Sequence, residues 1–350
     1  MRRYMKIGLF AFFMLAIIVF LFYPIDYYIY KPGNTYNTAD FVTVEGADKD
    51  DEGSFSLTTV AVMKGTPFSY VTASMQQFSE VRKVQEVRLK EEDDEEYEVR
   101  QIKMMDDSKF NAISVAFEQA GLSYEVDYKG LYILNVYEDS AADGIIQPGD
   151  VIVEVEQENI KSLEHFQQLL EPVEEGKEVE FVIERDSQLI TEKIRLKKIP
   201  GMDGQVGIGI SYNELRAIKS DPHVELQTDD IGGPSAGLMF TLEILNQLLD
   251  EDLTKGYDIA GTGEMFTDGT VGRIGGIEKK VVSAHQEKKD YFFVPDDEIT
   301  EAMKQRNPKV QSNYEAALET AKKIGTTMEI VPVKSIEDAL AFLEGLEPKN

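Results

Sequence analysis

Gly232-Gly233-Pro234-Ser235-Ala236-Gly237 is the most informative part of this 350-residue chain. Two glycines followed by a proline predict a tight turn that opens a helix, and the turn leaves the Ser235 side chain unobstructed. A serine in that setting is a candidate nucleophile if a base lies close to it. The stretch therefore predicts a helix that begins at a reactive serine.

A second glycine-rich stretch offers the base. Gly275-Gly276-Ile277-Glu278-Lys279-Lys280 carries two lysines at the start of a further predicted helix. A lysine in apolar surroundings can act as a base, because desolvation disfavours its charged form and lowers its pKa. His285 is a weaker candidate, since five residues beyond Lys280 it lies on another helix face, and we expect it to be structural. The two stretches together predict a serine nucleophile with a lysine base.

The composition excludes several classes of function. The net charge is −28, which argues against nucleic acid as a partner because phosphate binding needs a basic surface. The chain has no cysteine, so the sequence contains no disulfide, thiolate metal site or cysteine nucleophile. His165 and His223 lack the spacing of metal ligands, and no His-Glu-x-x-His or Gly-x-x-x-x-Gly-Lys-Ser/Thr occurs. The glycines of Gly207-Ile208-Gly209 are not followed by the rest of a nucleotide fingerprint. We expect no metal and no cofactor.

A basic flank and an apolar run open the chain. Arg2, Arg3 and Lys6 precede the run 7–23, which contains no charge and no proline. The run is long enough to span a bilayer, and the basic flank favours a cytoplasmic N-terminus. A cleaved signal peptide is the alternative, but residues 22–28 show no small-x-small cleavage site. Residues 1–30 are therefore predicted to be a cytoplasmic stub and a single transmembrane anchor, with the rest of the chain outside the cytoplasm.

The sequence from residue 31 to residue 120 predicts loops, a strand and a helix. We predict a loop over 31–37, a strand over 54–63 and an amphipathic helix over 109–120. The acidic run 91–96 lacks the glycine-broken alternation of a calcium loop. It is interpreted as a solvated helix start or loop.

Residues 126–199 show the order of elements of a small β-rich domain. A strand over 131–136 is followed by Pro148-Gly149-Asp150, an apolar strand, a helix over 162–170 and two further strands. This order resembles a bacterial PDZ domain, and the Pro-Gly-Asp turn is its most specific part. The resemblance implies a groove that binds a peptide as an added strand. The residues assigned to the groove are Gly130, Leu131, Tyr132, Leu134, Phe166 and Leu170. For the last four, ordinary core packing is the alternative.

The region from 200 onward alternates helices and strands, as in a mixed α/β layer. Helices are predicted over 235–249, 277–288, 314–324 and 335–346, and strands over 257–261, 291–294 and 327–331. Four motifs follow one another in this region: Gly233-Pro234-Ser235-Ala236-Gly237, Thr262-Gly263-Glu264, the segment 269–280, and Phe293-Val294-Pro295. Together they resemble the proteolytic domain of Lon-type serine peptidases, over residues 226–345.

The resemblance to Lon-type peptidases assigns roles to single residues. It implies that Lys280 is the catalytic lysine and that the Thr262 hydroxyl bonds the lysine amine. Lys279, beside Lys280 on the predicted helix, is expected to be a surface residue. The N–H groups around Ser235, at a helix start, are expected to form part of an oxyanion hole. Many Lon domains carry an aspartate three residues before the serine. Gly232 stands at that position, and Asp229 and Asp230 lie upstream, so the acidic group is displaced or absent.

The anchor, the PDZ segment and the Lon-like segment together resemble the membrane-anchored, PDZ-containing Lon-like proteases of Gram-positive bacteria. The predicted fold class is α+β: a transmembrane helix, a PDZ domain at 126–199 and a Lon-type α/β domain at 200–350, with 38–125 packed into the protease core. The implied function is an ATP-independent serine endopeptidase that cleaves extracytoplasmic polypeptides, and the alternative is a non-catalytic PDZ adaptor. The expected partners are polypeptide substrates and the membrane; homo-oligomer formation is left open.

Overall fold

The computed structural model describes residues 2–47, 52–89, 92–228 and 231–349, so Glu91, Asp229 and Asp230 lie outside the described residues. The chain folds as two compact units. The first comprises the described residues of 1–41, 48–90 and 235–350, and the second those of 42–47 and 91–234. In this division the described residues of 91–125 and 200–234 fall in the second unit, together with the segment that was predicted to be a PDZ domain.

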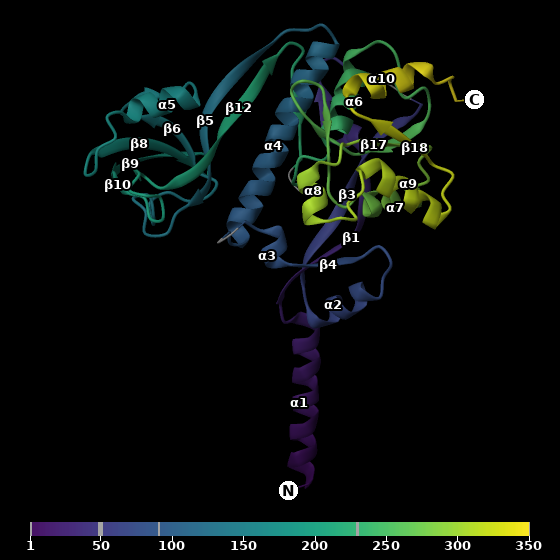
Figure 1. Cartoon of the computed structure of the whole chain (residues 1–350), viewed down its shortest axis with the longest axis horizontal. Helices are drawn as coiled ribbons and strands as arrows, with labels where there is room; N and C mark the ends of the chain where they lie inside the picture. The colour runs from purple at the N-terminus through teal and green to yellow at the C-terminus, as the bar shows by residue number, and fades with distance from the viewer. Residues whose placement is uncertain (1, 48–51, 90–91, 229–230, 350) are drawn as a thin grey trace. The chain divides into compact units, whose positions relative to one another are not determined.

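A mixed sheet forms the centre of the first unit (Figure 1). Its strand order is β18 (Glu329–Val333), β17 (Tyr291–Pro295), β14 (Asp258–Gly261), β3 (Ser54–Gly65), β1 (Ile25–Asn37) and β4 (Glu80–Lys83). The strands from β18 to β3 are parallel, and β1 runs antiparallel to both of its neighbours. Residues 55–58 of β3 are all buried, so both faces of this strand are covered.

Helices of the first unit pack against this sheet. Helix α6 (Gly237–Leu248) contacts β3 and β14, while α7 (Ile277–Gln286) contacts β1, β3 and α9 (Asn313–Ile324). Helix α10 (Ile336–Gly345) contacts β18. The shorter elements are η1 (Thr38–Asp40), α2 (Pro67–Ser74), α3 (Val84–Val87), β15 (Glu264–Met265), β16 (Val271–Gly272) and α8 (Glu301–Arg306). The mixture of helices and strands confirms the predicted fold class.

The predicted loop over 31–37 is wrong, because these residues belong to β1. The pairing of β1 with β3 is irregular between Pro32 and Thr35, and this irregularity lets a proline and a glycine remain inside the strand. A Cβ atom on Gly33 would lie 2.4 Å from Thr59 Oγ1 on β3, so the close approach of the two strands requires glycine here.

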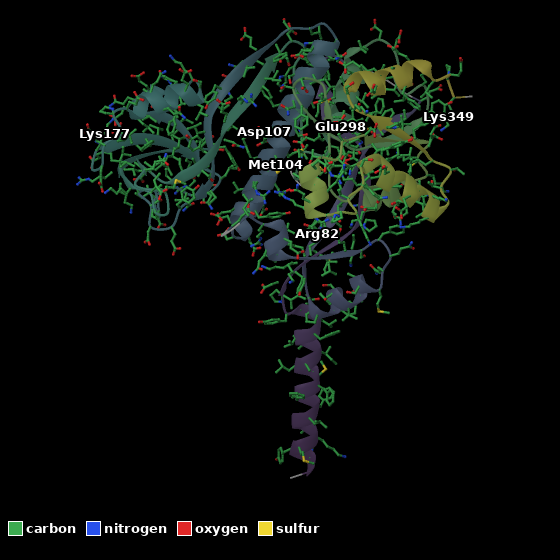
Figure 2. The ribbon with its side chains drawn as sticks, viewed as in Figure 1. Arg82, Met104, Asp107, Lys177, Glu298 and Lys349 are labelled. Atoms are coloured by element: carbon green, nitrogen blue, oxygen red, sulfur yellow. The ribbon has the colours of Figure 1, made fainter. Side chains whose placement is uncertain are left out.

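Helix α1 (Arg2–Phe22) precedes β1, and Figure 2 shows its side chains pointing outward along its length. Its segment Arg3–Phe22 has a mean hydropathy of 2.6 and none of it is buried. By length and composition this helix qualifies as a membrane span or as a signal sequence.

The second unit contains an antiparallel sheet with the order β12 (Ile210–Ser220), β5 (Tyr124–Val136), β6 (Val151–Val155), β8 (Glu178–Arg185) and β9 (Gln188–Arg195). Leu131, Ile152 and Phe181 lie in its core. Helix α4 (Asp94–Gln119) contacts β5 and β12, which explains why residues before 126 belong to this unit. Asp93 caps α4 in a capping box with Glu96, as expected for a helix start within the acidic run.

The remaining elements of the second unit are short. They are α5 (Leu163–Leu170), β7 (Glu158–Asn159), β10 (Lys197–Lys198), β11 (Val206–Gly207), β2 (Val42–Val44) and β13 (Val224–Leu226). Strand β2 pairs with β13 and β10 with β11, while β7 pairs with β6.

Candidate active site

Ser235 lies in the turn that leads into α6. The helix begins at Gly237 with Ala236 as its N-cap residue, two residues later than predicted. Gly233 has a φ of 84°, a left-handed conformation that favours glycine and lets the chain reverse just before the serine. The glycines of the motif therefore shape the turn, as expected from the sequence.

The main chain of Ser235 is held by the end of β14. Its carbonyl oxygen accepts a hydrogen bond from the Thr262 hydroxyl at 2.9 Å and one from the Gly263 N–H at 2.9 Å. The strand approaches α6 closely, since a Cβ atom on Gly261 would lie 2.5 Å from Met239 Sδ. The hydrogen bond that the Thr262 hydroxyl donates is thus to the main chain of Ser235, whereas the resemblance implied a bond to the lysine amine.

Lys280 reaches Ser235 from α7. This helix begins after Gly276, whose φ of 71° is again left-handed. The Lys280 Nζ lies 2.9 Å from Ser235 Oγ and donates a hydrogen bond of 2.6 Å to the carbonyl oxygen of Thr58 on β3. The side chain is only 3% exposed. Two helices and a strand thus bring a serine hydroxyl and a lysine amine into hydrogen-bond distance.

Burial determines the charge state of Lys280. Loss of solvent lowers its pKa from 10.5 to about 7. The oxygens within hydrogen-bond distance of its amine among the described residues are the Ser235 hydroxyl and the Thr58 carbonyl, and neither is a carboxylate that would favour the ammonium form. A large fraction of Lys280 is therefore neutral near pH 7 and able to accept a proton.

Lys279 is the natural comparison, because it precedes Lys280 on the same helix. The prediction that it lies at the surface is wrong, since it is buried on α7. Its Nζ lies 2.8 Å from Glu80 Oε2 on β4, so its charge is compensated. The two neighbouring lysines thus have opposite surroundings: one is paired with a carboxylate, and the other faces uncharged oxygens.

The main chain around Ser235 provides hydrogen-bond donors. Within the part of the chain that the structure describes, no acceptor is found for the N–H groups of Ser235 and Ala236. They precede the first turn of α6, where the helix dipole favours negative charge. Asp229 and Asp230, considered as a displaced acidic group, lie outside the described residues.

One contact of the Lys280 amine has no counterpart in any sequence motif. Thr58 acts through its main-chain carbonyl oxygen, which every residue possesses, so no side-chain pattern signals it. His285, by contrast, lies apart from these contacts, and its Nδ1 is 2.9 Å from the Thr326 hydroxyl. No cluster of metal-ligating side chains is found among the described residues.

The groove residues assigned on β5 need a correction. This strand is paired on both edges: Leu131 is opposite Ile152 of β6 and Glu214 of β12. A peptide cannot add as a further strand to an edge that is already occupied. Leu131 and Phe166 lie in the core, Leu170 packs against it, and Gly130 faces the Ile152 carbonyl, so Gly130, Leu131, Tyr132 and Leu134 do not form a peptide-binding edge.

Strand β12 lies at one edge of this sheet, and β9 lies at the other. The Tyr212 ring of β12 packs edge-on against Phe166 of α5, with the centroids 5.6 Å apart, and Glu214 accepts a hydrogen bond of 3.2 Å from the Leu163 N–H. Gly209, immediately before β12, has a φ of 79° and abuts Ser140. The glycines on either side of Ile208 are the sequence signal for this turn before β12.

Comparison with known families agrees with these observations. The family model described as the Lon protease (S16) C-terminal proteolytic domain matches residues 218–342, and the model of the PDZ domain matches residues 113–196. The chain therefore carries a PDZ domain and a Lon-type proteolytic domain. Ser235, Thr262 and Lys280 all lie within the match to the Lon-type proteolytic domain.

Curated relatives match only part of this chain. The Lon protease of the Aster yellows witches'-broom phytoplasma is 24% identical over 136 residues, which cover 38% of this chain and 15% of that protein. An uncharacterized protein of Methanocaldococcus jannaschii is 36% identical over 88 residues, covering 25% of this chain and 22% of that protein. The chain thus spans less than a quarter of the length of either relative.

Two solved structures are similar to the PDZ segment. The PDZ domain of the SdrC-like protein from Listeria monocytogenes is 27% identical, with a TM-score of 0.24, and covers 25% of this chain and 92% of that domain. The corresponding domain from Listeria innocua is 31% identical, with a TM-score of 0.23, and covers 24% of this chain and 93% of that domain.

Proposed function

We propose that this chain, which combines a Lon-type proteolytic domain with a PDZ domain, is a serine endopeptidase. In this proposal Ser235 is the nucleophile and Lys280 is the general base. The observation that carries the proposal is the 2.9 Å separation of Lys280 Nζ and Ser235 Oγ at a buried lysine whose pKa is lowered to about 7. A lysine serving only as a charged surface group would not be buried against a hydroxyl and a carbonyl.

The proposed reaction has two stages. Ser235 Oγ attacks the carbonyl carbon of a peptide bond while its proton passes to the neutral Lys280 amine. The resulting ammonium group protonates the departing amine, and the serine remains as an ester. Lys280 then takes a proton from a water molecule that attacks the ester, and returns the proton to Ser235 as the acid leaves.

Two main-chain features support this chemistry. One N–H of the Lys280 amine donates to the Thr58 carbonyl, which orients the lone pair of the neutral amine toward the serine hydroxyl. The N–H groups of Ser235 and Ala236 at the start of α6 are placed to donate to the oxyanion. One donor of this kind contributes about 3 kcal/mol to transition-state stabilisation.

Helix α1 is proposed to anchor the enzyme. The apolar span follows the basic residues Arg2, Arg3 and Lys6, which favours a cytoplasmic N-terminus and an active site on the other side of the membrane. Cleavage is proposed to be independent of ATP, because this sequence carries no Gly-x-x-x-x-Gly-Lys-Ser/Thr.

The PDZ domain is proposed to hold polypeptide substrates at the β12 edge. This strand stands at the end of its sheet and has α5 beside it, the arrangement in which a peptide adds as a further strand. The chain then continues from β12 through β13 to the Ser235 turn, so the binding strand and the nucleophile belong to one continuous segment.

The test is mass spectrometry of the peptides that the full chain, in detergent, releases from an unstructured protein. The full chain is needed because β1, directly after α1, is part of the sheet. We expect cleavage by the wild type and by Lys279→Met, but none by Ser235→Ala or Lys280→Met. Equal cleavage by all four proteins would place the active site elsewhere. Absence of cleavage together with binding of the unstructured protein would favour the adaptor.

A further inference from the structure

The segment 65–79 stands out from the rest of the chain by its lack of charge. Charged residues make up 29% of the sequence, yet none occurs from Gly65 to Ser79. The segment contains α2, and its apolar side chains are outside the core: Phe68 is 46% exposed, Val71 49% and Met75 83%. Positions 68, 71 and 75 lie on one side of a helix, so the exposed apolar groups gather on one face.

The opposite side of α2 attaches it to the folded unit at the end of α1. Ala73 is buried, and the ring of Tyr70 packs edge-on against Tyr27 of β1, with the centroids 5.1 Å apart. The Phe68 ring packs in the same way on Phe20 of α1, at 6.1 Å. Figure 1 shows α2 beside the C-terminal end of α1. Phe68 therefore lies level with the last turn of the apolar helix.

The charge around α2 also differs from that of the chain as a whole. Residues 23–37 and 61–89 contain five basic and three acidic side chains, whereas the chain carries −28 overall. Arg82 and Arg88 stack on Tyr30 and Tyr28 of β1, at 5.1 and 5.5 Å from the ring centroids. Figure 2 places Arg82 at the end of the unit from which α1 extends. A locally basic, aromatic-rich surface is suited to the headgroup layer of an anionic bilayer.

We infer that α2 is a second membrane contact, which lies in the bilayer interface with its Phe68, Val71 and Met75 face in the lipid. This inference rests on the proposal that α1 spans the membrane. Lipid is the occupant that the contacts favour, because the exposed face continues directly from the apolar surface of α1 through the Phe20–Phe68 pair. A helix of this kind enters the boundary of headgroups and acyl chains to a depth of about 5–10 Å.

The test exploits the absence of tryptophan from the chain. Four full-length variants, Leu15→Trp, Phe68→Trp, Val71→Trp and Leu318→Trp, are reconstituted in vesicles of neutral and anionic phospholipid. Their fluorescence is quenched with lipids that carry nitroxide groups at a shallow or a deep position. Leu15 lies in α1, and Leu318 on α9 is 43% exposed, which matches Phe68 and Val71 in exposure.

The variants should separate into three groups. We expect Leu15→Trp to be quenched most by the deep label, Phe68→Trp and Val71→Trp to be blue-shifted and quenched most by the shallow label, and Leu318→Trp to be unaffected. If Leu15→Trp is quenched while both α2 variants behave like Leu318→Trp, the inference fails and the anchor stands. If the emission of Phe68→Trp and Val71→Trp is blue-shifted but is not quenched by the lipid labels, the inference of a lipid contact is wrong and a protein partner covers α2. If Leu15→Trp is not quenched, α1 does not span the membrane, and the inference about α2 fails as well.

Discussion

Lys280 Nζ and Ser235 Oγ lie 2.9 Å apart, although the two residues are 45 positions apart in the sequence. The contact is made by elements that the rest of the fold fixes: α7 begins at a left-handed glycine, and the serine turn is held by Thr262 and Gly263. The main chain thus fixes the positions of the two side chains relative to each other, as the proposed proton transfer requires.

The pH dependence of hydrolysis should follow Lys280. Its pKa is lowered to about 7 by burial, and only the neutral amine accepts a proton. We expect kcat/KM to rise about tenfold per pH unit below this pKa and to level off above it. Initial rates on a fluorogenic peptide derived from a mapped cleavage site would measure this. His285→Gln is the control, and a shift of the profile in that variant would identify the wrong titrating group.

The buried lysine should also destabilise the folded state near neutral pH. Between about pH 7 and 10.5 the unfolded chain binds a proton at Lys280 that the folded chain does not bind, so the free energy of unfolding rises with pH in this window. Lys280→Met lacks this group. We expect the variant to have a higher Tm than the wild type at neutral pH, with the difference shrinking as the pH approaches 10. A pH-independent difference would contradict the shifted pKa.

Thr262 should affect the rate through the position of Ser235. Its hydroxyl donates a hydrogen bond to the Ser235 carbonyl oxygen, and Thr262→Val removes one of the two donors to that oxygen. The loss of this bond is expected to lower the free energy of unfolding by about 1 kcal/mol. We expect kcat to fall, KM to change little and the pKa of the pH profile to stay unchanged. Thr262→Ser should restore the rate. A shifted pH profile in Thr262→Val would instead favour direct contact with the lysine amine.

Substrate binding should protect the β12 edge. An unstructured protein that the wild type cleaves is offered to Ser235→Ala, and amide hydrogen exchange is followed by mass spectrometry. Added strand pairing should slow exchange in 210–214, while 130–136 should change little because β5 already has partners on both edges. Slower exchange in β5 without slower exchange in β12 would instead support a peptide groove on β5.

The sequence predicted which two side chains of the candidate site lie close together, but not the main-chain contacts around them. Glycine turns and an ordered set of motifs selected Ser235 and Lys280, because side chains needed for chemistry leave a local pattern. The Thr58 carbonyl leaves none, and the bond from Thr262 to the Ser235 carbonyl depends on how closely β14 approaches α6. The catalytic roles of Ser235, Lys280 and Thr262 stay predictions.

Long-range strand pairing explains the errors in the fold. Residues 31–37 contain Pro32 and Gly33, yet they continue β1 because β3 supplies a partner 25 residues away in the sequence, as the bond between Asn34 and Thr59 illustrates. The sequence alone favours a groove on β5, because the edge partner of this strand, β12, comes more than 70 residues later in the chain. Local patterns predict that a strand exists, but they do not reveal which edge of it is covered.

The most direct test of the Ser235–Lys280 pair is to measure, as a function of pH, how fast a serine-directed organophosphonate modifies the protein. The intact mass gives the rate, and peptide mapping identifies the modified residue. We expect a single adduct on Ser235, formed faster as the pH rises through about 7 in the wild type and in Lys279→Met, and nearly absent in Lys280→Met. An adduct on another residue, or an equal rate in Lys280→Met, would contradict the proposed pair.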